Sequence, residues 1–168
     1  MRSLQILFNM MDGEQLAYLI KSDFKLKQIF VGIYPRDLLP KTIRKRPAII
    51  IINTDVSSGP GQHWVVVYLG LSSAEYFDSY GLNVQSLDIL TFIHNHSSKY
   101  VYNDRVIQHI FSLKCGLYCL YYALKKARGA NMVSILKPFK ITNPRYNEKV
   151  LMKLLNNFKI IRARIELL

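Results

Sequence analysis

The stretch PAIIIINTD, residues 47–55, constrains the fold more than any other part of the chain. It contains the isoleucine run 49–52, and β-branched side chains favour β-strands. The run is apolar without polar alternation, which is typical of a strand buried on both faces. We therefore expect an α+β fold in which a small, mostly antiparallel sheet is packed by helices.

Hydrophobic spacing and turn residues predict the other elements. A capped helix should run from Asp12 to about Lys21. The clearest helix should run from Cys115 to Ala127, because basic residues occupy its last turn and Gly129 supplies a stop. Strands or extended segments are expected at 29–40, 61–70, 73–81 and 99–108, the middle two forming a hairpin, and further helices at 83–94 and 143–158.

Length and charge bound the class of protein. The chain has 168 residues, half of them hydrophobic, and shows no repeat or linker, so we expect a single domain over 1–168. Its formal net charge is +12, with basic residues spread from Lys21 to Arg164. This favours an anionic partner, DNA first, but a basic surface that binds nothing has the same composition. Both interpretations stay open.

The two cysteines are expected to be free thiols. Cys115 and Cys119 would lie one turn apart in one helix, where a disulfide between them is poorly placed. Free thiols predict a reducing compartment and not secretion. Residues 1–14 look like mature sequence, because acidic residues follow the short apolar run and no cleavage site appears. No run approaches the ~18 apolar residues of a membrane span, so we expect no membrane partner. We also expect a monomer.

A histidine and an aspartate should meet across the hairpin. If the turn centres near Gly70 and Leu71, paired residues have numbers that add up to about 141, which sets His63 opposite Asp78. A carboxylate beside an imidazole fixes its tautomer and raises its basicity. A slip of one residue would offer Glu75 or Ser79 instead. A structural histidine is the competing interpretation.

Cys115 is the candidate nucleophile. A cysteine in the first turn of a helix lies near unpaired N–H groups and the positive end of the helix dipole, which stabilise a thiolate. Gly116 beside it leaves room for a substrate backbone. Cys119, a turn further on, should be unreactive core, and Cys115 could itself be a small buried apolar residue.

Two further groups of residues have side chains suited to chemistry. The Gln108 amide and a backbone N–H at the helix start could together donate to a developing oxyanion. Zinc ligation by His94, His96, His109 and the cysteines is a weak alternative, because the chain lacks the paired-cysteine spacing of a structural zinc site. We expect no metal and no cofactor for the chemistry.

Together, GQHW at 61–64, YFDSYG at 76–81, Gln108 and KCGLYC at 114–119 resemble the adenovirus proteinase family of cysteine peptidases. More distantly they resemble the SUMO-specific ubiquitin-like proteases. NTD at 53–55 and GIYPRDLLP at 32–40 are similar to the adenovirus-like proteases of Maverick or Polinton elements and related double-stranded DNA viruses. The resemblance covers about 12–158 and implies a papain-like or adenain-like fold with the nucleophile at a helix N-terminus.

The resemblance also implies roles for individual residues. Cys115 would be the nucleophile, His63 the general base and then acid, Asp78 its orienting partner, and Gln108 the oxyanion donor together with the Cys115 amide. Trp64 would line or shield the site. Cleavage of viral capsid or core precursors after small residues such as Gly is implied, in the virion or the host cell interior (nucleus or cytoplasm).

The sequence departs from the adenoviral pattern at two points. That enzyme has Glu where this chain has Asp78, although other members of the clan use Asp. It is also activated by a peptide that bonds to a separate cysteine, and by DNA. Only Cys115 and Cys119 exist here, which argues against a disulfide-linked activator but leaves DNA stimulation open. The basic tail at 160–168 has no counterpart that we can assign.

Two other functions remain possible from the sequence. The same site could deconjugate ubiquitin or a ubiquitin-like modifier, whose Gly-Gly terminus would suit it. Alternatively, the chain could be a catalytically idle DNA-binding relative that keeps the fold. Cleavage of modifier fusions would identify the deconjugating enzyme. Equal, slow labelling of the two cysteine thiols would identify the idle DNA-binding relative.

Overall fold

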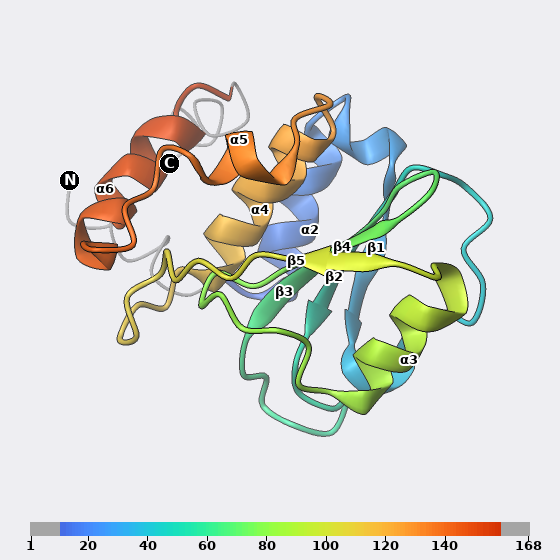
Figure 1. The fold of residues 1–168 in the computed structure, drawn as a ribbon. Helices are drawn as coiled ribbons and strands as arrows, with labels where there is room; N and C mark the ends of the chain where they lie inside the picture. Colours follow the sequence, from blue (N-terminus) through green and yellow to red (C-terminus); the bar gives the residue numbers. More distant parts are fainter. Residues whose placement is uncertain (1–10, 159–168) are drawn as a thin grey trace.

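The structure is a computed structural model that describes residues 11–158. A five-stranded sheet in the order β1-β2-β3-β4-β5 lies at its centre, with helices on both faces (Figure 1). The fold is therefore α+β, as predicted. The strands are Phe30–Pro35 (β1), Ala48–Asn53 (β2), Trp64–Leu69 (β3), Ala74–Phe77 (β4) and Tyr100–Tyr102 (β5). The helices are Gly13–Ser22 (α2), Leu87–His96 (α3), Cys115–Lys126 (α4), Met132–Leu136 (α5) and Pro144–Leu155 (α6), with 3-10 turns at Leu26–Gln28 (η1) and Arg36–Leu38 (η2).

The sheet is mixed, which corrects the expectation of a mostly antiparallel one. β3 pairs antiparallel with β2 and β4, but the outer strands β1 and β5 each pair in parallel with their neighbours. The long connection from β4 to β5 carries α3, and such a crossover returns the chain in the same direction. Turn residues signal hairpins, whereas parallel pairing has no local signal.

β2 is buried on both faces, as its isoleucine run predicted. Ile49 and Ile51 belong to a core that includes α2, α4 and α6. Ile50 and Ile52 belong to a second core, covered by α3. The sheet therefore separates two apolar layers, and Figure 1 shows α3 on the opposite side from α2 and α4.

α4 lies between the sheet and the outer helices α5 and α6 (Figure 1). Every residue from Gly116 to Leu124 is buried, so this helix is apolar on all sides, as a central helix must be. At its far end the Lys126 ammonium pairs with a Glu75 carboxylate oxygen at 2.8 Å and lies 4.1 Å from the centre of the Tyr68 ring. This packing fixes α4, and with it the position of Cys115.

The local predictions hold to different degrees. Asp12 and Gln15 form the capping box that opens α2. α3 begins at Leu87 and not near Asn83, because the Asn83 side chain accepts hydrogen bonds from the Val84 N–H (2.8 Å) and the Tyr100 hydroxyl (3.0 Å) and so holds a non-helical segment. The short helix α5 was not predicted.

Two sequence features lie partly or wholly beyond the described residues. The basic tail at 160–168 is outside them, as are the first ten residues of the segment interpreted as mature N-terminus. Between residues 11 and 158, none of the helices is long and apolar enough to cross a bilayer.

Candidate active site

A pocket of about 660 Å³ opens where the start of α4 meets the start of β3. His63, Trp64, Tyr80 and Cys115 lie in its wall. The wall also includes the start of α2, the end of β1, the loop after β2, and Ser112 and Leu113 before α4. Several distant segments therefore meet around one thiol.

The structure places Cys115 as the first residue of α4. Within the helix, the first backbone hydrogen bond runs from the Tyr118 N–H to the Lys114 carbonyl at 3.1 Å. The N–H groups of the three residues before Tyr118 therefore lie outside the helix's own ladder, at the positive end of its dipole. A negative charge on the Cys115 sulfur, or on an oxygen beside it, is stabilised in that position.

His63 lies between an acid and the thiol. Its Nε2–H donates to Asp78 Oδ1 at 2.8 Å, and the His63 and Asp78 side chains are only 15% and 5% exposed. Cys115 acts on the imidazole as well, and its side chain contributes to raising the pKa of His63. Because Nε2 is used by Asp78, Nδ1 is the ring nitrogen that faces the sulfur.

The charge of Asp78 and the sulfur of Cys115 govern the protonation of His63. Burial would lower the pKa of the imidazole, but its hydrogen bonds to Asp78 and Cys115 raise the pKa of His63 to about 9. His63 is therefore protonated at neutral pH, and a positive charge there stabilises negative charge on a neighbouring sulfur. A pair of thiolate and protonated imidazole is the reactive form of a cysteine nucleophile.

The hairpin register differs from the prediction by two residues. Val66 pairs with Phe77 and Leu69 with Ala74, which sets Tyr80, not Asp78, opposite His63. The rings of His63 and Tyr80 stack at 4.7 Å accordingly. Asp78 still reaches the imidazole because a shift of two residues keeps its side chain on the same face of the sheet.

Two residues that the sequence did not single out hold Asp78 in place. The buried Asn103 accepts a hydrogen bond from the Asp78 N–H at 2.8 Å and donates to the Asp78 carbonyl at 2.7 Å. The Tyr80 N–H donates to Asp78 Oδ1 at 2.8 Å. Tyr80 lies inside the quoted YFDSYG motif, whereas Asn103 follows β5 and has no signal in the sequence.

Gln108 is 1% exposed, and its side-chain amide is hydrogen-bonded to other residues of the protein. Its Nε2 donates to the Ser112 carbonyl at 2.8 Å and to the Tyr80 hydroxyl at 3.2 Å, while Oε1 accepts from the Ser79 hydroxyl at 2.6 Å. Both amide protons thus have partners, and Gln108 fixes the segment that leads into Cys115. The role of Gln108 as an oxyanion donor stays a prediction. To fulfil it, Nε2 would have to give up one of these two hydrogen bonds and donate to the oxyanion instead.

The structure places Trp64 in the pocket wall, where its indole N–H donates to the Met11 carbonyl at 3.1 Å. Gly116 lies elsewhere than expected. A Cβ added there would be 3.3 Å from Met11 Cβ and 3.4 Å from Trp64 Cδ1, and Gly116 is not among the described residues that line the pocket. Because Gly116 has no side chain, Trp64 and Met11 can pack closely on α4.

The loop that precedes His63 is held by its own side chains. Asn53 Oδ1 accepts from the Asp55 and Gln62 N–H groups at 2.9 and 3.1 Å. Asp55 Oδ2 accepts from the Gly61 N–H at 3.0 Å, and a Cβ on Gly59 would lie only 2.2 Å from that same oxygen. The sequence predicted a loop here, but not that it forms a fixed wall of the pocket.

Two of the histidines weighed as zinc ligands, His96 and His109, form hydrogen bonds within the protein. His96 Nε2 accepts from the Ile43 N–H at 3.1 Å and its Nδ1 donates to the Phe92 carbonyl at 2.8 Å. His109 Nε2 accepts from Arg145 at 3.1 Å. Across residues 11–158, no three His, Cys, Asp or Glu side chains gather as a metal site.

The comparison with known proteins adds a relative. Over 131 residues the sequence is 29% identical to "Cysteine protease S273R" of African swine fever virus (isolate Tick/Malawi/Lil 20-1/1983), a match that covers 68% of this chain and 47% of that protein. The chain is related to a viral cysteine protease. It spans about half the length of this relative. No protein-family model matches the sequence.

Solved structures show weaker similarity. The crystal structure of the African swine fever virus pS273R protease aligns with a TM-score of 0.44 and 22% identity over 61% of this chain and 43% of its own. The SUMO protease Ulp1, with its catalytic cysteine oxidised to a sulfinic acid, aligns with a TM-score of 0.47 and 14% identity over 88% and 78%. The relationship to viral cysteine proteases, predicted from the motifs, thus rests on the sequence match.

Proposed function

We propose that this chain is a cysteine endopeptidase domain. The observation that carries the proposal is the chain of contacts from Asp78 Oδ1 through His63 to Cys115 at the start of α4, in the wall of an open pocket. Acyl transfer through a thiolate needs this arrangement of acid, base and nucleophile. The relative's name, a cysteine protease, supports the same chemistry.

In the proposed reaction, the Cys115 thiolate attacks the scissile carbonyl carbon. The C–N bond then breaks, protonated His63 gives its proton to the leaving amine, and a thioester to Cys115 remains. His63 next removes a proton from water, whose oxygen attacks the thioester, and the carboxylic acid product and the Cys115 thiolate are released. Asp78 keeps the imidazole oriented through both steps. The Cys115 N–H and, after rearrangement, Gln108 stabilise the oxyanion.

As substrates we propose viral precursor polypeptides, of the capsid or core, cleaved after small residues such as Gly. The resemblance to adenovirus-type proteases and the viral relative support this. The charge of +12 supports stimulation by DNA. Such an enzyme would act in the virion or inside the host cell, in the nucleus or cytoplasm.

The proposal is tested with a peptide panel that varies the residues around Gly-Gly and Gly-Xaa. Wild type, Cys115→Ala and the matched control Cys119→Ala are compared, with and without duplex DNA at low salt. We expect cleavage by wild type and Cys119→Ala and none by Cys115→Ala, with faster cleavage when DNA is present. Equal cleavage by Cys115→Ala contradicts the assignment of the nucleophile.

Other outcomes select the alternatives. Preference for ubiquitin-like modifier fusions over viral-type peptides would identify a deconjugating enzyme. DNA binding without cleavage, together with slow labelling of Cys115, would identify an idle relative. Cleavage that DNA leaves unchanged would remove the regulatory role from the proposal but keep the protease.

A further inference from the structure

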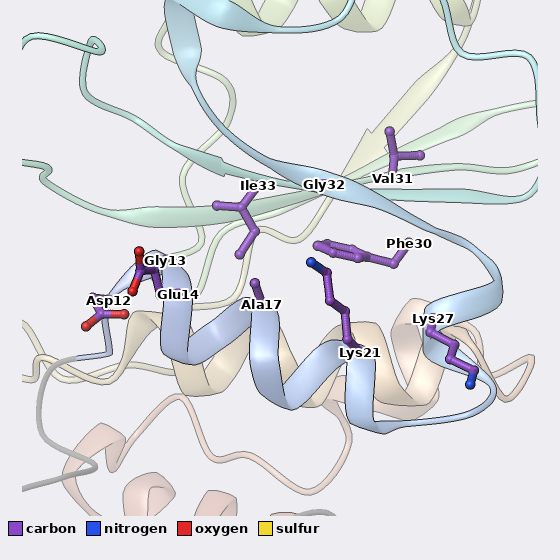
Figure 2. A pocket seen from close by; sticks show the side chains of 10 residues that line it. All are labelled: Asp12, Gly13, Glu14, Ala17, Lys21, Lys27, Phe30, Val31, Gly32 and Ile33. Atoms are coloured by element: carbon purple, nitrogen blue, oxygen red, sulfur yellow. The ribbon is translucent and has the colours of Figure 1, made fainter.

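A second groove, of about 740 Å³, lies between α2 and β1 (Figure 2). Asp12, Gly13 and Ile33 line both this groove and the active-site pocket, so the two adjoin at the start of α2. β1 is an edge strand of the described sheet. The groove therefore leads away from Cys115 along an open side of the molecule.

An irregularity in β1 shapes the apolar part of the groove. The pairing with β2 shifts between Phe30 and Gly32, and such a bulge re-aims the side chains that follow it. As a result Phe30 and Ile33, which strict alternation would place on opposite faces, both contact the core on the α2 side. Figure 2 shows them beside Ala17 of α2, whose small side chain keeps the space open.

The ends of the groove differ in charge. At the end distant from Cys115 lie Lys21, which extends from α2 toward β1, and Lys27 on the turn before β1, whose side chain points away from Lys21 (Figure 2). The Lys27 ammonium lies 5.2 Å from the centre of the Phe24 ring. Among residues 11–158 neither ammonium forms an ion pair. At the near end, Asp12 Oδ1 already accepts the Gln15 N–H at 2.8 Å, beside the exposed Glu14. The groove is thus apolar along its length and basic at its far end.

We propose that this groove binds an extended segment of the polypeptide substrate, with an acidic side chain of that segment bound by Lys21 and attracted by the further positive charge of Lys27. The inference rests on the proposed protease function and adds a specificity determinant to it. Lys21 follows Gly13 by eight residues in α2, or about 12 Å along the helix. An extended chain covers that length in about four residues, which places the acidic side chain about four residues beyond those in the active-site pocket.

The test measures binding to the Cys115→Ala protein, so that cleavage does not interfere. Labelled Gly-Gly core peptides are extended on the N-terminal or the C-terminal side, with Glu at three to six residues from the core. Matched peptides carry Gln or Lys at the same position. We expect the best Glu peptide to bind about three- to tenfold more tightly than its Gln counterpart, on one side of the core only, and the difference to shrink at high salt.

Charge-reversed proteins locate the effect. Lys21→Glu/Lys27→Glu should abolish the preference for Glu and favour the Lys peptide instead, without changing the affinity of the unextended core. The matched control is Lys149→Glu/Lys153→Glu, which reverses the same number of exposed charges on α6. That variant should keep the preference. Equal affinity for Glu and Gln peptides at every position would overturn the proposal that the groove binds an acidic extension. Loss of the preference in the α6 control as well would also overturn it.

The inference and the protease function fail separately. Cysteine-dependent cleavage of the core by wild type, without any preference for an acidic extension, overturns the groove and leaves the protease standing. A Lys21- and Lys27-dependent preference in the binding assay, without cleavage of any peptide by wild type, supports the groove and contradicts the protease function.

Discussion

Cys115 and Cys119 lie one turn apart on the same helix and differ in their position within it, their burial and their neighbouring groups. Cys115 opens α4, lies in the pocket wall and contacts His63. Cys119 is fully buried, and its thiol donates to the Trp64 carbonyl at 3.1 Å. Burial raises the pKa of the Cys119 thiol well above its usual value. Residue type alone therefore says little about reactivity; the helix end, the neighbouring imidazole and access to solvent decide it.

Alkylation should show the largest difference between the two thiols. Near neutral pH we expect iodoacetamide to modify Cys115 at least about 100-fold faster than Cys119, because only Cys115 lies in the pocket wall and at the start of a helix, where negative charge on sulfur is stabilised. The rates are measured by mass spectrometry on the single variants Cys119→Ala and Cys115→Ala, each of which keeps one thiol. Adding His63→Ala should slow Cys115 toward an ordinary exposed thiol. Equal, slow rates would contradict the proposed nucleophile.

Changes at Asp78 test what makes Cys115 different. Asp78→Ala should lower kcat/KM about 100-fold, because the imidazole loses both its orientation and its charge partner. Asp78→Asn should cost about tenfold, since the amide oxygen still accepts from Nε2–H but carries no charge. Asp88→Asn on α3 is the control for a carboxylate paired at the surface, with Arg36, and should change kcat/KM less than about twofold. Wild-type kinetics in Asp78→Ala would remove Asp78 from the mechanism.

The pH profile should follow His63. Because the pKa of His63 is raised to about 9, the imidazole should stay protonated up to that pH, and kcat/KM should fall above it, since His63 then has no proton to give to the leaving amine. In Asp78→Asn this basic limb should move toward the ordinary histidine value of about 6.5. A basic limb that stays in place in Asp78→Asn would mean that another group controls it.

The same raised pKa makes stability depend on pH. The stabilisation from protonated His63 is complete below about pH 6.5 and is lost as the pH rises through about 9. Urea denaturation across this pH range measures the free energy of unfolding of wild type and of His63→Ala. The extra free energy of unfolding that wild type has over His63→Ala should become smaller as the pH rises.

Cys119 should matter for stability and not for turnover. Cys119→Ala removes a donor from the Trp64 carbonyl and leaves a small cavity, so we expect a loss of about 1–2 kcal/mol in the free energy of unfolding. The kcat/KM of the folded protein should stay within about twofold. Urea denaturation and kinetics on the same samples measure both. A large loss of activity at unchanged stability would show that Cys119 takes part in the site.

Much of the fold follows from local sequence. The isoleucine run of β2, the capping box of Asp12 and Gln15 and the helix that begins at Cys115 are each encoded within a few residues. The parallel pairing of β1 and β5 is not, because the partners of these strands are distant in the chain. The start of α3 differs from the predicted one because Asn83 accepts a hydrogen bond from Tyr100, which is also distant in the chain.

The candidate site divides along the same line. The residue types at 63, 78, 108 and 115, and their order, are properties of the sequence, and they predict the chemistry. The sequence also placed Cys115 at a helix start, because helix signals are local. Only the tertiary structure brings Asp78 to His63 through a register that differs from the predicted one, and turns Gln108 toward Ser112 and Tyr80. These contacts join segments whose relative positions are set by packing of the two cores, and no short stretch of sequence encodes that packing.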